Sequence, residues 1–225
     1  MKQNSRLFVF SALLFCSTLA LSQTRQSVPL TGGSIRLVNV VTKTENYLGK
    51  ESLSVTGTAK GDEEQFVRIN ALFKNGVIEV DVAGKPGAGA AETARGFVGI
   101  AFRISNDNSK FECLYLRPTN GRAEDQERRN HAVQYVSFPD YPWFRLRKET
   151  PGKYESYADL VSGAWASMKI VIEGDHAKLF VNGVPQPTLV VNDLKLGPDQ
   201  EGGIGLWVGP GTEAHFANLT ITPQE

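Results

Sequence analysis

Side chains suited to binding a polar ligand are concentrated in the middle of the sequence. Tyr and Trp rings combine a flat apolar body with a polar handle, and Arg, Gln and His supply hydrogen bonds. Carbohydrates present hydroxyl groups around apolar C–H faces, so this mixture predicts a carbohydrate-binding site. The candidate contacts are Arg103, Tyr115, Arg117, His131, Gln134, Tyr135, Trp143 and Arg145.

Two of the residues in this region are candidates for acid/base chemistry, namely Glu112 and His131. Glucanases of the β-sandwich class carry Glu-x-Asp-x-x-Glu on one strand. Glu79-Val-Asp81 reproduces the first half of that motif, but the position of the second Glu is occupied by Gly84. The sequence also lacks a Gly-x-Ser-x-Gly elbow. No catalytic motif is complete, so the sequence leaves open whether the chain is an enzyme.

Metal and cofactor sites are not predicted. The three histidines, His131, His176 and His215, do not have the spacing of a metal motif. The Asn-Asp-Asn run at 106–108 offers oxygens to a structural Ca²⁺ but lacks a full ligand set, and a turn is favoured there. Cys113 lies in an apolar-rich strand, which predicts a buried small hydrophobic residue and not a nucleophile.

The first 22 residues have the pattern of a secretory signal peptide. Lys2 and Arg6 precede an apolar stretch over 7–21, and the small residues around Ser22 predict cleavage after it. The stretch is short for a membrane span. We therefore expect a secreted or periplasmic protein whose mature part, residues 23–225, is one domain. That part has a net charge of −2, which gives no electrostatic case for nucleic acid or anionic membrane as a partner.

Strand signals dominate the mature part, and helical periodicity is nearly absent. Short apolar-rich or alternating segments are separated by Gly, Asn and Asp turns. About a dozen such strands predict an all-β, two-sheet antiparallel sandwich of the jelly-roll type. The expected strands are 34–41, 52–55, 66–69, 77–82, 97–104, 111–117, 131–138, 165–173, 177–181, 203–208 and 214–222.

The strands 97–104 and 111–117 form a predicted hairpin whose register decides the site. A turn centred on Asp107 places Arg103, Tyr115 and Arg117 on one open face and turns Glu112 into the core. A slip of one residue brings Glu112 beside Arg103 instead, as an ion pair. The sequence does not choose between these registers.

Further predictions concern the loops and the tryptophan residues outside this hairpin. The Gly/Ala-rich segment 84–96 is typical of a mobile loop, either a plain connector or a flap beside a ligand face. Residues 139–143 predict a rigid proline-flanked turn that presents Trp143, either to a ligand or as a plug of the sandwich end. Residues 122–129 are charged and predict a surface loop with one helical turn. Trp165 and Trp207 lie within strands and are expected in the core.

Several strand and turn motifs resemble the concanavalin A-like lectin/glucanase superfamily. They are Gly96-Phe-Val-Gly-Ile-Ala-Phe-Arg103, Phe111-Glu112, Gly163-Ala-Trp165 before Met168-Lys-Ile-Val-Ile, Phe180-Val-Asn-Gly183, Gly203-Ile-Gly-Leu206 and Phe216-Ala-Asn-Leu-Thr-Ile221. Within the superfamily they look most similar to the 3-keto-disaccharide hydrolase domains and the laminin-G-like jelly rolls. The resemblance covers roughly residues 30–222 and implies two packed antiparallel sheets, with any glycan on the concave sheet or its rim.

Three functions follow as hypotheses. The first is a secreted carbohydrate-binding or carbohydrate-processing jelly roll. The second is a glycoside hydrolase acting on 3-keto-disaccharides, with Glu112 or His131 supplying the acid/base group. The third is an extracellular protein-binding module of the laminin-G type, which would carry an exposed apolar patch of several hundred Å².

Overall fold

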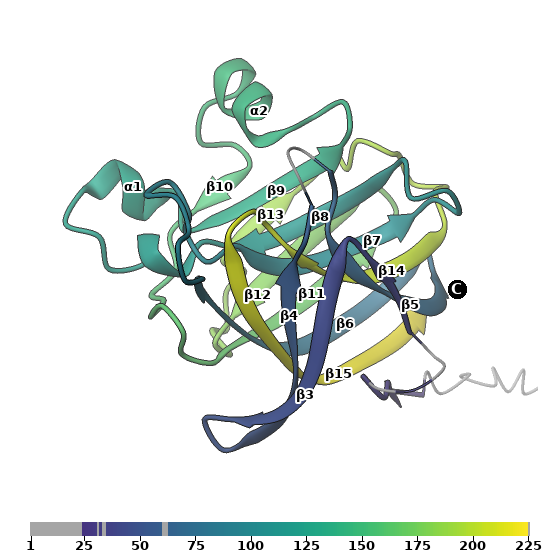
Figure 1. Ribbon diagram of the computed structural model, residues 1–225. Helices are drawn as coiled ribbons and strands as arrows, with labels where there is room; N and C mark the ends of the chain where they lie inside the picture. Colours follow the sequence, from purple (N-terminus) through teal and green to yellow (C-terminus); the bar gives the residue numbers. More distant parts are fainter. Residues whose placement is uncertain (1–23, 31, 33–34, 60–62, 225) are drawn as a thin grey trace, which may run out of the picture.

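The computed structural model describes residues 24–224 apart from 31, 33–34 and 60–62 (Figure 1). The predicted signal peptide therefore lies outside the described residues. Among the residues described, no helix is long and apolar enough to cross a membrane.

Two antiparallel sheets form a sandwich, which confirms the predicted fold class (Figure 1). The larger sheet has eight strands in the order β13-β12-β11-β6-β15-β4-β3, with β1 also paired to β15. Its strands are β1 (Gln26–Ser27), β3 (Val40–Tyr47), β4 (Lys50–Gly57), β6 (Asn75–Pro86), β11 (Ala166–Glu173), β12 (His176–Val181), β13 (Leu189–Val191) and β15 (Thr212–Gln224).

The smaller sheet has seven strands in the order β10-β9-β8-β7-β14-β5-β2. Its order shows that β7, in the middle of the sheet, pairs with β8 on one side and with the distant β14 on the other. The strands are β2 (Ile35–Val38), β5 (Phe66–Phe73), β7 (Val98–Ile104), β8 (Phe111–Leu116), β9 (Val133–Phe138), β10 (Glu155–Ser156) and β14 (Gly202–Val208).

The main core lies between the sheets and is made by alternate residues of each strand. On β7, Ile100 and Phe102 point into it, and Leu114 does so from β8. A second, smaller apolar cluster covers the outer face of the seven-stranded sheet and includes Ala101 and Cys113. The seven-stranded sheet is therefore apolar on both faces, whereas an antiparallel sheet commonly has one polar face. An apolar outer face of this kind is typical of a binding surface.

Three short helical segments interrupt the strands on one side of the sandwich: η1 (Pro118–Asn120), α1 (Gln126–Asn130) and α2 (Trp143–Glu149). The first turn of α1 is capped by the Asp125 carboxylate, which accepts from the Arg128 N–H at 2.8 Å, as expected for one helical turn in this charged segment. The turn predicted over 139–143 continues into α2, which the sequence pattern did not predict.

Candidate functional site

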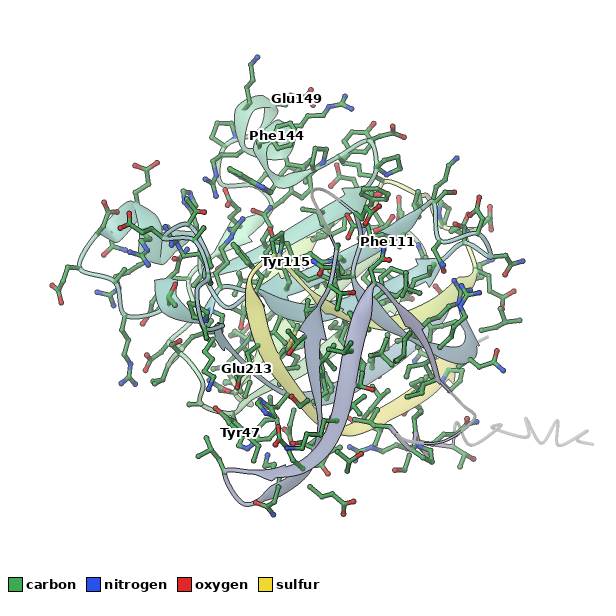
Figure 2. All side chains as sticks on the ribbon, viewed as in Figure 1. Tyr47, Phe111, Tyr115, Phe144, Glu149 and Glu213 are labelled. Atoms are coloured by element: carbon green, nitrogen blue, oxygen red, sulfur yellow. The ribbon has the colours of Figure 1, made fainter. Side chains whose placement is uncertain are left out.

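The hairpin of β7 and β8 has the register that follows from a turn centred on Asp107. Phe102 pairs with Glu112, Ala101 with Cys113, and Gly99 with Tyr115. Tyr115 therefore belongs to the outer face, whereas Glu112 points between the sheets. Figure 2 shows Phe111 and Tyr115 together on this hairpin, away from Tyr47 on the other sheet.

A transverse row of residues crosses the outer face of the seven-stranded sheet. The pairings align Trp207, Gly99, Tyr115, Gln134 and Glu155 on five neighbouring strands. A Cβ at Gly99 would come within 2.5 Å of the Tyr115 Cβ. Because Gly99 has no side chain, the rings of Tyr115 and Trp207 meet above it, with their centroids 4.8 Å apart.

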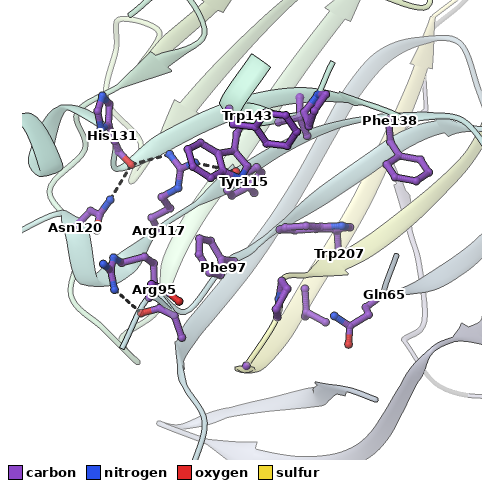
Figure 3. Close-up of a pocket in the computed structure, with 18 of the residues that line it drawn as sticks. Gln65, Arg95, Phe97, Tyr115, Arg117, Asn120, His131, Phe138, Trp143 and Trp207 are labelled. Atoms are coloured by element: carbon purple, nitrogen blue, oxygen red, sulfur yellow. Dashed lines mark hydrogen bonds between the residues drawn. The ribbon is translucent and has the colours of Figure 1, made fainter. Parts of the chain in front are cut away.

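A cavity of about 900 Å³ opens over this row (Figure 3). Its size is that of a small-molecule site. Its walls come from residues around 63–65, from the segment 91–97, from η1 and α1, and from α2. The side chains that line it include Arg95, Phe97, Phe111, Tyr115, Arg117, His131, Val136, Phe138, Trp143, Phe144, Arg147 and Trp207.

Arg117 is the central cation of the polar end of this cavity, and its guanidinium is fixed by hydrogen bonds. It donates to Glu155 Oε1 at 3.2 Å, to the Tyr115 hydroxyl at 3.0 Å and to Gln134 Oε1 at 3.0 Å. A further bond goes to the His131 carbonyl oxygen at 3.1 Å. Arg117 is therefore oriented before any ligand arrives, which lowers the entropic cost of binding.

Trp143 lies beside two cations at the rim. The guanidinium carbon of Arg147 is 4.8 Å from the indole centroid and that of Arg117 is 5.9 Å away. Both guanidinium groups also bind Glu155, whose side chain is only 3% exposed. Burial alone would raise the pKa of Glu155, but Arg147, Arg117 and His131 outweigh it and lower the pKa. A buried carboxylate thus holds the aromatic and cationic groups of this end together.

His131 also lies at the polar end of the cavity, and its imidazole ring forms part of the lining. Its Nε2 lies 3.5 Å from Glu155 Oε2, and its side chain is 17% exposed. Burial lowers the pKa of His131, opposed by the Glu155 charge. The ring is therefore neutral at pH 7, and the carboxylate favours the tautomer with its proton on Nε2, which leaves a lone pair on Nδ1.

The structure brings four of the eight predicted contacts to the cavity: Tyr115, Arg117, His131 and Trp143. Gln134 lies directly behind them with no exposed surface, and its amide bridges Arg117 to the carbonyl oxygens of Tyr135 and Tyr154. Gln134 supports the site without lining it.

The expectation that Arg103 shares the open face with Tyr115 is wrong. A β-bulge on β7 breaks the alternation: Phe102 and Arg103, the latter with a φ of 54°, oppose the single residue Ile204 of β14. Arg103 therefore follows Phe102 into the interior, and Ile104 takes the outer face. The buried guanidinium donates to the carbonyl oxygens of Lys74, Gly174 and Gly197. These bonds join three turns at one end of the sandwich.

Glu112 and Tyr135, two further candidates, also point between the sheets and not into the cavity. Both are fully buried, and the Tyr135 hydroxyl donates to Glu112 Oε2 at 2.8 Å. Glu112 Oε1 accepts from the Leu196 N–H at 2.6 Å, and the Tyr135 oxygen accepts from the Lys195 N–H at 2.9 Å. The pair anchors the segment at 194–197, and desolvation raises the pKa of Glu112 to about 6.

Arg145 lies on the solvent side of α2. Its guanidinium pairs with Glu149 at 2.8 Å, donates to the Asp140 carbonyl and stacks 4.4 Å from the centroid of the Tyr141 ring. It is separate from the side chains that line the cavity.

Trp207 was expected in the core, and this expectation is wrong. Ile204, Leu206 and Val208 of β14 face inward, so the alternate position of Trp207 faces the cavity, where its indole N–H donates to Glu64 Oε2 at 2.9 Å. The alternation around Trp207 could have revealed this. Trp165 is also only partly buried, and its N–H donates to the Tyr47 carbonyl at 3.0 Å on the other sheet.

The Gly/Ala-rich segment supplies one wall of the cavity through Ala91, Thr93, Ala94 and Arg95. It is held to the β14–β15 turn by a hydrogen bond from the Gly87 N–H to the Gly211 carbonyl oxygen at 2.9 Å. Its position beside the cavity fits the flap hypothesis, and its motion stays a prediction.

The turn at 106–108 is built by its own hydrogen bonds. Asp107 Oδ1 accepts from the hydroxyl groups of Ser105 and Ser109, which lower the pKa of Asp107 to about 2. Asn108 Oδ1 accepts from the guanidinium groups of Arg36 and Arg68, an arrangement that disfavours a cation there. Within the described part of the chain, His, Cys, Asp and Glu side chains form no cluster of three or more that could hold a metal ion.

Cys113 is fully buried beneath the cavity floor, as predicted, and its burial raises the thiol pKa well above the usual value. The thiol is therefore protonated and unreactive at neutral pH.

Solved structures of low sequence identity share this fold. The carbohydrate-binding module CBM66 from Bacillus subtilis has a TM-score of 0.56 at 15% identity, over 83% of this chain and 93% of that one. A glycosidic hydrolase has a TM-score of 0.55 at 12% identity, over 90% and 97% of the two chains. Peanut lectin has a TM-score of 0.51 at 10% identity, over 88% and 96%.

The sequence comparisons give the family. No curated protein matches this chain. One family model, described as the 3-keto-alpha-glucoside-1,2-lyase-like domain, matches residues 37–222. This range begins in β2 and ends in β15, so it includes both sheets and every wall of the cavity. The chain belongs to the 3-keto-alpha-glucoside-1,2-lyase-like domain family.

Proposed function

We propose that the cavity binds a carbohydrate and that the domain cleaves 3-keto-glucosides there. The observation that carries the proposal is the row of Tyr115 and Trp207 rings ending at a pre-oriented Arg117 and a neutral His131. Flat rings suit the C–H faces of a sugar, and the polar end suits its oxygens. The family description and the lectin-like fold support the same ligand class.

Cleavage of a 3-keto glucoside by elimination requires few catalytic groups from the protein. A ketone at C3 acidifies the hydrogen on C2, so that one base suffices to remove it. Nδ1 of His131 takes that proton, the C2–H electrons form a C1=C2 double bond, and the bond from C1 to the aglycone oxygen breaks. The aglycone leaves as an alcohol after it takes up a proton. Arg117 lies nearby to stabilise the negative charge that develops on the C3 oxygen.

Glu112, the other acid/base candidate, is turned towards the interior, and this favours His131 for that role. Glu155 then acts through His131 as its positioning residue, because the carboxylate fixes the ring and its tautomer.

A product analysis tests the proposal. The purified protein is incubated with methyl 3-keto-α-glucopyranoside, and methanol and the sugar product are followed by mass spectrometry. Elimination gives a sugar lighter by one water than the product of hydrolysis, so the experiment also separates the lyase reaction from the hydrolase alternative. Absence of any product, together with no heat of binding for the oxidised or unoxidised glucoside, would refute the proposal.

A pair of histidine variants locates the base. His131→Gln is expected to slow product formation by about 100-fold or more while binding is retained. His176→Gln is the matched control, since His176 begins β12 outside the cavity, with a side chain 56% exposed. Equal rates for the two variants would exclude His131 as the base.

The protein-binding hypothesis has less support in the described residues. The large exposed apolar side chains are distributed over separate elements, for example Leu37 on β2, Leu72 on β5 and Val190 on β13. A protein interface of the laminin-G type would need them in one patch.

A further inference from the structure

The cavity changes its chemical character along the strands that form its floor. On β8 the outward residues run from Phe111 through Cys113 to Tyr115, and Arg117 follows the strand. A strand rises about 3.3 Å per residue, so Phe111 and Arg117 are roughly 20 Å apart along it. Figure 3 shows the same order, with His131 and Arg117 at one side, Tyr115 between them and Phe138 at the other side.

The neighbouring strand β9 changes from apolar to polar residues in the same direction as β8. Phe138 pairs with Phe111, Val136 pairs with Cys113, and the stacked rings of Phe111 and Phe138 have centroids 5.2 Å apart. At the level of Tyr115 the partner becomes the amide of Gln134. One end of the floor is thus built from rings and aliphatic groups, and the other from hydrogen-bonding groups.

The inward turn of Arg103 removes a cation from the apolar end. Regular alternation would have placed its guanidinium beside Phe111, but the bulge puts Ile104 on the outer face instead. Glu112 also points inward, and the Cys113 thiol is protonated. At this end the outward side chains of β8 and β9 are therefore apolar, through the backbone geometry as well as through the residue types.

The rim extends the apolar surface towards solvent. Pro139 and Pro142 line the cavity on the connection between β9 and α2, and Phe144 of α2 is 60% exposed. An exposed ring of this size gains free energy when a ligand covers it. Its neighbour Trp143 meets it edge to face, with centroids 5.9 Å apart.

We propose that the apolar end, formed by Phe111, Val136, Phe138 and Pro139, is a subsite for an apolar, preferably aromatic, aglycone. The inference rests on the proposed function, since it assumes that the sugar ring lies on Tyr115 and Trp207 beside His131. The group attached at C1 then extends along the strands towards Phe138. The preferred substrate is an aryl glycoside, whose leaving group is an apolar ring, and not a disaccharide, whose leaving group is a second polyol.

The test compares two ligands that differ only in the aglycone. Isothermal titration is carried out with phenyl and methyl α-glucopyranoside, and with their 3-keto forms. A phenyl ring in an aromatic subsite is expected to tighten binding by about tenfold or more over a methyl group. Equal affinities for phenyl and methyl ligands would overturn the subsite while leaving sugar binding intact. No binding by any of the four would instead overturn the proposed function itself.

Two variants locate the subsite. Val136→Ala shortens a partly buried side chain of the floor, and Phe138→Ala removes the ring beside it. Each is expected to reduce the phenyl-to-methyl ratio by about threefold or more and to leave the affinity for the methyl glycoside unchanged. Tyr157→Ala is the control, because this exposed aromatic residue lies outside the cavity. An unchanged ratio in both variants would show that the aglycone binds elsewhere and would overturn the assignment.

Discussion

The Glu155 carboxylate lies 3.2 Å from the Arg117 guanidinium, and both side chains are at most 6% exposed. Arg147 and His131 approach the same carboxylate, so a single negative charge holds three cavity residues in place. An ion pair at this depth is costly to break because each partner would be left as a buried, unpaired charge.

Glu155→Gln is therefore expected to lower the free energy of unfolding by about 3 kcal/mol. It should also lower the pKa of His131 further, since the charge of Glu155 is the larger of the two, with that of Glu127, that raise it. Urea denaturation and an NMR titration of the imidazole measure the two effects. Glu149→Gln provides the control, because its pair with Arg145 is at the surface and should contribute less than about 0.5 kcal/mol. An unchanged His131 pKa in the Glu155 variant would contradict the positioning role.

The buried Glu112 gives stability a specific pH dependence. Its pKa is about 6 in the folded protein, against an ordinary value of 4.5, so the folded state binds this proton more tightly than the unfolded state does. Ionisation therefore destabilises the fold mostly as pH rises from about 4.5 to 6, by about 2 kcal/mol in total. Above about pH 7 the difference is constant.

Denaturant unfolding at several pH values, compared with Glu112→Gln, isolates this contribution from other titrating groups. The wild-type protein is expected to lose about 2 kcal/mol relative to the variant between about pH 3.5 and pH 7, most of it between pH 4.5 and 6. Parallel stability curves for the two proteins across this range would show that Glu112 titrates normally.

Arg103→Met tests the role of the residue that the sequence placed in the site. It removes the bonds to the carbonyl oxygens of Lys74, Gly174 and Gly197, and it should lower the free energy of unfolding by about 3 kcal/mol or more. Glucoside affinity should not change, because the side chain does not reach the cavity. Arg145→Met, at the surface, should have an effect within about 0.5 kcal/mol. A loss of ligand affinity in a folded Arg103 variant would contradict this account.

Gly99→Ala tests the contact between the rings of Tyr115 and Trp207. The added Cβ would lie 2.3 Å from the Leu114 carbonyl oxygen and 2.5 Å from the Tyr115 Cβ, so both the backbone and the ring must shift. We expect a loss of stability of about 2–3 kcal/mol and weaker glycoside binding. Gly87→Ala is the matched control, since its nearest contact is an ordinary 3.6 Å and it should stay within about 0.5 kcal/mol. Thermal unfolding and titration calorimetry measure both, and equal melting temperatures for the two variants would refute the steric argument.

The sequence predicted the sandwich because its strands are local patterns of alternating apolar residues. For the β7–β8 hairpin the sequence left two registers open, and the structure has the one with the turn centred on Asp107. Tyr115 and Arg117 were expected on the open face in that register, and His131 and Trp143 were found from residue type alone.

The remaining parts of the site depend on contacts between distant segments. The bulge that turns Arg103 inward lies on β7 itself, but it forms against β14, and the guanidinium binds carbonyl groups of Lys74, Gly174 and Gly197, so no local pattern reveals it. Glu155 enters the site because a two-residue strand pairs with β9, and Arg147 because seven residues form an unpredicted helix. The prediction that Trp207 lies in the core was wrong, although the sequence of β14 already shows the alternation of residues that turns Trp207 outward.

The hydrogen bonds of Arg103 distinguish one part of the molecule, in which substitutions are costly, from other parts that tolerate substitution. The end of β7 is fastened to three turns, so replacing residues there disturbs the whole sandwich. The segment 87–96 and the residues around 63–65 contribute cavity walls without belonging to the main core, and α2 contributes Leu146 to that core. Surface segments of this kind tolerate insertion and substitution. New ligand preferences can therefore arise by exchanging the walls while the clamped sheet beneath them stays the same.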